Sequence, residues 1–160
     1  MRVRFVRIAG EHDRIYVTRD NGTEVSWSFP SYGNAVPHDL VHLVVETHFQ
    51  LRRGFWGRVA DGVDPKRVNE EANRHGGAVA SKYAGFGSDL RELLLAEALA
   101  AVVWIIDENQ LRNARELAAG LGIELTDEAL DEVRGQLVEL NAKWRTLVPK
   151  GTLEMTFIAS

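Results

Sequence analysis

The chain has 160 residues, of which 45% are hydrophobic and 26% charged. This composition is typical of a folded globular protein, and we treat residues 1–160 as a single globular domain. The net charge of −4 argues against nucleic acid as a partner, because phosphate binding uses a basic surface. With no cysteine in the chain, a bound metal ion would need His, Asp and Glu ligands, which suit zinc, iron or manganese.

We expect no targeting or membrane-spanning segment in this sequence. Its first residues alternate charged and apolar side chains, which is a strand pattern and not a signal peptide. The most apolar segment, 93–106, is interrupted by Glu97 and is shorter than the roughly 20 residues that cross a bilayer. We therefore expect a soluble, cytoplasmic protein without a membrane partner.

Three β-strands are predicted at the start of the chain and one near its end. Residues 2–9 alternate in polarity, residues 14–20 follow a polar turn, and an Asn-Gly pair indicates a hairpin leading into 23–29. The last predicted strand is 152–158. Strands at both ends with helices between them indicate an α+β fold. We expect an N-terminal antiparallel β-meander plus a C-terminal strand, covered by four to five helices.

The segments between the strands carry helical signals. Periodicity and capping residues predict helices over five ranges: 37–50, 65–76, 89–107, 111–119 and 127–147. Residues 76–87 are rich in glycine and are interpreted as a connection. Residues 53–58 are interpreted as a loop whose two aromatic residues plug the end of the core. The last helix has an apolar seam that packs against the core or against a second copy, which leaves a homo-oligomer open.

The helix predicted at 37–50 has an unusually narrow polar stripe. His38, His42 and Glu46 follow each other at four-residue steps, so they lie within an arc of about 80° on the helix surface. Asp39 lies beside this arc, and most other positions are apolar. Ordinary surface helices have a wide polar face. The stripe therefore marks the candidate functional site.

Three interpretations of the stripe are open. In the first, His38, His42 and Glu46 bind a divalent ion, with Asp39 as a fourth ligand or as an acceptor that orients an imidazole. In the second, the stripe lines a cleft where a histidine and a carboxylate act as general acid and base. In the third, the residues are structural: His38 lies at the helix start, Glu46 and Asp39 are solvated, and His42 is a hydrogen-bonded, half-buried histidine.

A second carboxylate, Glu97, is the only charged side chain in the apolar segment 93–106. A carboxylate inside a core must pair with a cation, take up a proton or bind a metal ion. If the two helices pack side by side, Glu97 completes a site with His42 and Glu46. The alternative is that Glu97 lies on an exposed edge flanked by alanines.

The order His38-Asp39-x-x-His42 resembles the HDxxH element of the ubiquinone-biosynthesis accessory proteins, whose HDxxH…E motif binds a metal. The resemblance covers these three residues and implies a metal site at them. In that family the acid lies further along the chain, at about Gly54 here, whereas the nearest acid in this chain is Glu46. The family is also all-helical, unlike the strands predicted here.

The sharper hypothesis from these observations is a metal-dependent enzyme that acts on a small molecule, in which the ion activates water or polarises an oxygen. The alternative is a non-catalytic structural or interaction domain that associates through its sheet or its last helix. No motif identifies a substrate or a catalytic residue.

Overall fold

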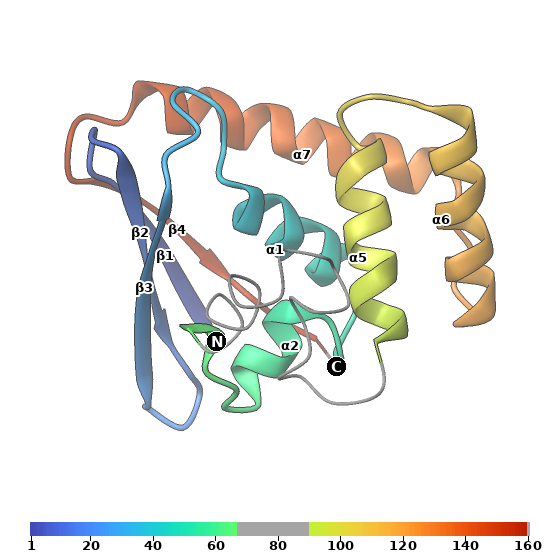
Figure 1. The fold of residues 1–160 in the computed structure, drawn as a ribbon, viewed down its shortest axis with the longest axis horizontal. Coiled ribbons are helices and arrows are strands. Elements are labelled where there is room, and N and C mark those ends of the chain that lie inside the picture. The colour runs from blue at the N-terminus through green and yellow to red at the C-terminus, as the bar shows by residue number, and fades with distance from the viewer. Residues whose placement is uncertain (67–89, 160) are drawn as a thin grey trace.

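The computed structural model describes residues 1–66 and 90–159, and within them it has an α+β fold, as the sequence predicts. Four strands form one antiparallel sheet in the order β3-β2-β1-β4. Their bounds are β1 Arg2–Arg7, β2 His12–Thr18, β3 Glu24–Pro30 and β4 Gly151–Thr156. The C-terminal strand therefore returns to the N-terminal meander and pairs with its first strand (Figure 1).

One face of the sheet is buried, because the strand residues alternate between apolar and polar side chains. In β1, Val3 and Phe5 are fully buried, whereas the alternating residues Arg2 and Arg4 are exposed. A strand turns successive side chains to opposite faces, so this alternation gives the sheet one core face and one polar face.

Five helices lie within the described residues. They are α1 His38–His48, α2 Phe55–Ala60, α5 Arg91–Val102, α6 Glu108–Gly120 and α7 Asp127–Thr146. Thr126 caps α7, and α6, which is capped by Asp107, begins three residues before the predicted range 111–119. The predicted helix at 65–76 and the glycine-rich connection at 76–87 lie largely outside the described residues.

Helix α1 is the centre of the helical layer. It contacts α2, α5 and α7, and Figure 1 shows it between the sheet and α5. All residues from Leu40 to Glu46 are buried, His42 and Glu46 among them. A helix covered on almost every side is normally apolar throughout. The two buried polar residues of α1 therefore need partners from its neighbours.

The interpretation of residues 53–58 as a loop was wrong. Helix α2 begins at Phe55, directly after Gly54, and only the residues before it form a turn. The expectation that its two aromatic residues plug the core is met: Trp56 is fully buried and contacts the rings of Phe5 and Trp27.

The apolar seam of the last helix packs inside the protein. Its residues Leu130, Val133, Leu137, Leu140 and Trp144 are all buried. Among the described residues, no helix is long and apolar enough to cross a membrane.

We expect helix α5 to depend on its buried leucines. Leu99 is fully buried and Leu94, on the same helix, is 40% exposed. Leu99→Ala should lower the free energy of unfolding by about 2–5 kcal/mol, because the methyl groups it removes leave a cavity. Leu94→Ala, the matched control, should lower it by less than about 1 kcal/mol. Urea unfolding of both variants tests this, and equal losses would contradict the burial of α5 described here.

Candidate metal centre

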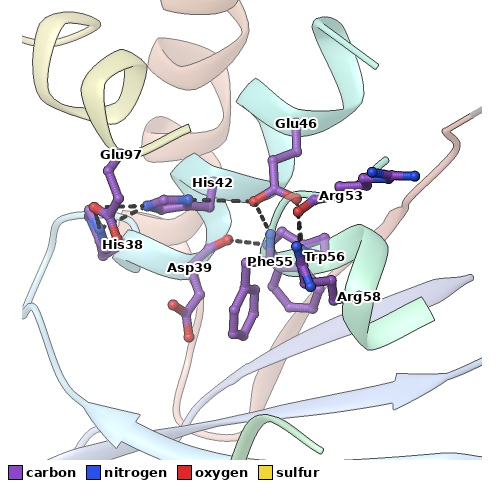
Figure 2. A network of polar contacts seen from close by, with 9 residues as sticks. All are labelled: His38, Asp39, His42, Glu46, Arg53, Phe55, Trp56, Arg58 and Glu97. Carbon is purple, nitrogen blue, oxygen red and sulfur yellow. Dashed lines mark hydrogen bonds and ion pairs between the residues drawn. The ribbon is translucent and has the colours of Figure 1, made fainter. Parts of the chain in front are cut away.

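Two histidines of α1 point to the same place because of helix geometry. Pro37 precedes the helix, and His38 and His42 are one turn apart on one face. Their Nε2 atoms are 3.1 Å apart. Helix α5, which packs beside α1, brings Glu97 to the same point, as Figure 2 shows.

The three side chains converge on one position with one atom each. Glu97 Oε2 lies 3.6 Å from His38 Nε2 and 3.4 Å from His42 Nε2. Within the described part of the chain, His38, His42 and Glu97 form a group of ligand-type atoms that could hold a metal ion. The structure thus joins the two helices at Glu97, and the carboxylate is not isolated on an exposed edge.

The triangle formed by these three atoms has the size of a metal coordination face. Its sides of 3.1, 3.4 and 3.6 Å give a circumscribed radius of about 2.0 Å, close to the usual distance from zinc to nitrogen or oxygen. A point about 2.1 Å from all three atoms would lie roughly 0.8 Å out of their plane, as in a tetrahedron with a fourth corner open. The three atoms are therefore spaced as the ligands of one metal ion would be.

Exposure differs sharply across the group. The His42 side chain is 3% exposed and that of Glu97 22%, whereas that of His38 is 41% exposed. The position between the three atoms is therefore buried on the His42 side and borders the surface on the His38 side.

Glu46 lies outside the group, on the other side of the His42 ring. Its Oε1 is 3.6 Å from His42 Nδ1, slightly longer than a hydrogen bond. The backbone N–H of Phe55 donates to Oε1 at 2.9 Å, and that of Trp56 donates to Oε2 at 2.8 Å. The carboxylate is fully buried and receives these hydrogen bonds from the start of α2.

Gly54 gives the Glu46 carboxylate its space. A Cβ atom at this position would lie 2.5 Å from the carboxyl carbon of Glu46. The backbone of Gly54 has φ −69° and ψ −171°, an extended conformation open to any residue. Glycine is required here by the neighbouring carboxylate and not by the backbone.

Asp39 also lies outside the group. Its carboxylate Oδ2 is 3.5 Å from Trp27 Nε1, toward the sheet. Its backbone carbonyl accepts a 2.9 Å hydrogen bond from Trp56 Nε1, which ties α2 to α1 a second time. Figure 2 shows that the Asp39 carboxylate points away from the position shared by the two histidines and Glu97.

The electrostatics of the site depend on His42 and its two carboxylates. Burial lowers the pKa of His42, but the neighbouring carboxylates of Glu46 and Glu97 raise it more, so that its pKa lies at about 9. Burial raises the pKa of Glu46, although His42 and the two backbone N–H groups oppose this. In the metal-free protein, His42 therefore carries a positive charge at neutral pH that offsets the buried carboxylate.

The other two histidines of the described residues lie outside the group. His12 is exposed. His48 is the last residue of α1, and its Nε2 is 3.9 Å from Oε2 of Glu132 on α7. The His48 side chain is 26% exposed. His75 lies outside the described residues.

Sequence reasoning missed the role of the residues around Gly54. The two N–H groups that bind Glu46 belong to the backbone and leave no trace in side-chain patterns. The only available signal was a glycine directly before two aromatic residues that begin a short helix.

The raised pKa of His42 makes a prediction about the metal-free protein. Its pKa rises from 6.5 in the unfolded chain to about 9 in the fold, so its contribution to stability is complete below pH 6.5 and is lost as pH rises through 9. In the presence of chelator, we expect the free energy of unfolding to fall between pH 6.5 and 10. The fall should be larger for the wild type than for His42→Gln, by on the order of 1–3 kcal/mol. Urea unfolding at several pH values measures this difference, and parallel pH profiles would refute it.

Comparisons with protein families, with curated proteins and with solved structures find no match to this chain. The local resemblance at His38, Asp39 and His42 is therefore not accompanied by a family match. The four-stranded sheet also separates this fold from an all-helical one.

Proposed function

We propose that the protein binds one divalent metal ion between His38, His42 and Glu97, and that this ion serves a reaction on a small molecule. The observation that carries the proposal is the triangle of Nε2, Nε2 and Oε2 atoms, whose sides are all between 3.1 and 3.6 Å. Buried and half-buried polar side chains are normally held near a partner, and one ion shared by all three would be such a partner.

The ligand set supports zinc as the ion. Two imidazoles and one carboxylate bind the metal in known catalytic zinc sites.

The reaction class follows from the number of ligands and from their exposure. Structural zinc sites are closed by four protein ligands, whereas catalytic sites keep a position for water or substrate. Here three side chains supply ligands, and the exposed side of His38 gives access from the surface. An ion in this position would lower the pKa of a bound water or polarise a substrate oxygen, as in metal-assisted hydrolysis.

The alternative is a non-catalytic interaction domain in which the two histidines are structural. The buried seam of α7 removes one of the surfaces considered for association. The small-molecule substrate and the cytoplasmic location stay predictions.

Metal uptake tests the site directly. Protein purified without an affinity tag and dialysed against zinc should hold about one ion per chain, and chelator should lower its thermal unfolding temperature. His42→Ala and Glu97→Gln should lose the ion, because two ligands rarely hold zinc. Elemental analysis measures the content.

Two controls change the same residue types away from the site: His48→Ala on α1 and Glu116→Gln on the exposed side of α6. Both should keep the ion. Wild type without bound zinc, and with a melting temperature unaffected by chelator, would instead support the structural interpretation.

An open coordination position can be tested apart from metal binding. Cobalt substituted for zinc gives visible absorption that changes when a small anion enters its coordination shell. We expect azide to shift this spectrum in the wild-type protein, since three side chains leave a position free. An unchanged spectrum at high azide concentration would show a closed, structural site and would contradict the proposed enzyme.

A further inference from the structure

We propose that Glu46 is the positioning residue of this metal centre: held by the backbone at the start of α2, it turns Nδ1 of His42 away from the ion and Nε2 toward it. The inference rests on the proposed function, since it concerns how one ligand of that site is oriented. It gives Glu46 a role different from the direct metal ligation predicted from the sequence.

The Glu46 carboxylate is fixed before any ion is considered. Each of its oxygens accepts one backbone N–H, from Phe55 at 2.9 Å and from Trp56 at 2.8 Å. Two charge-assisted hydrogen bonds to a fully buried carboxylate hold it strongly, because leaving a buried charge unpaired is costly. Gly54 lies against its other side, where even a methyl group would overlap it.

His42 lies between this fixed carboxylate and the ion position. Its Nε2 faces His38 and Glu97, and its Nδ1 faces Glu46 Oε1 at 3.6 Å (Figure 2). Nδ1 is buried and has no hydrogen-bond partner of normal length in the structure. A ring movement of about 0.5 Å would make Nδ1–H donate to Glu46 at ordinary hydrogen-bond distance.

The chemistry of imidazole then determines which nitrogen binds metal. A neutral ring carries one proton, and the nitrogen without it supplies the lone pair. A carboxylate beside Nδ1 holds the proton there and leaves Nε2 free for the ion, which fixes both tautomer and ring orientation. Metal-binding histidines commonly have such an acceptor, and its removal typically weakens metal binding by about 10- to 100-fold.

Glu46 cannot be a metal ligand in this arrangement. It lies beyond the opposite edge of the His42 ring from the ion position, and both its oxygens are held by backbone N–H groups. Its effect on the metal must therefore pass through His42. Gly54 contributes to the metal centre in the same indirect way, because it leaves room for the Glu46 carboxylate that orients His42.

Two variants and one control test this role by zinc affinity in competition with a chromophoric chelator. Glu46→Gln removes the carboxylate charge, and Gly54→Ala pushes the carboxylate from its place without changing its chemistry. Gly135→Ala on α7, where an added Cβ meets nothing within 4 Å, is the matched control. We expect zinc binding about 10- to 100-fold weaker in the first two variants and unchanged in the third.

A spectroscopic measurement covers the case in which a variant fails to fold. Two-bond ¹H–¹⁵N spectra of the zinc-loaded wild type report which ring nitrogen of His42 carries the proton. A proton on Nδ1 and zinc on Nε2 are expected. Zinc on Nδ1, or wild-type zinc affinity in folded Glu46→Gln and Gly54→Ala, would overturn the positioning role while leaving the metal site intact. Absence of zinc binding by the wild type itself would overturn the proposed function, and this inference with it.

Discussion

The helical layer depends on one buried carboxylate that accepts two backbone hydrogen bonds. Glu46 belongs to α1, and its carboxylate accepts hydrogen bonds from the first two backbone N–H groups of α2. These bonds join the two helices at a buried point. A hydrogen bond to a charged group contributes about 1.5–3 kcal/mol, more than the roughly 1 kcal/mol of a bond between neutral groups. The orientation of the Phe55 and Trp56 rings over the sheet follows from this junction, because their own backbone forms it.

Much of the fold could be predicted because it depends on local patterns. Alternation predicts the strands, and capping residues such as Thr126 mark a helix start. Helix α2 could not be predicted, because its six residues carry little periodicity and its start is fixed by Glu46, which precedes Phe55 by nine positions. The start of this short helix is stabilised by a side chain outside it, so the sequence of the helix alone does not predict it.

The candidate site was predicted in part. The four-residue spacing places His38 and His42 on one face, and the isolated charge of Glu97 in an apolar segment points to a partner on another helix. The same spacing also suggests Glu46 as a ligand, but periodicity cannot say which edge of a ring a neighbour meets. The structure places Glu46 on the Nδ1 edge and Asp39 toward Trp27, so neither joins the group formed with Glu97.

The position of β1 in the sheet has a consequence for the order of folding. A short turn joins β1 to its partner β2. Its other partner, β4, lies near the far end of the sequence, so that Arg2 pairs with Thr156. Closing so long a loop loses more chain entropy than forming the hairpin, and contacts of long sequence separation form slowly. We expect the meander and the α1–α5 contact to form while one edge of β1 is still open. We expect the pairing of β4 with β1 to form last, when the end of the chain covers a strand edge that would otherwise be available to other strands.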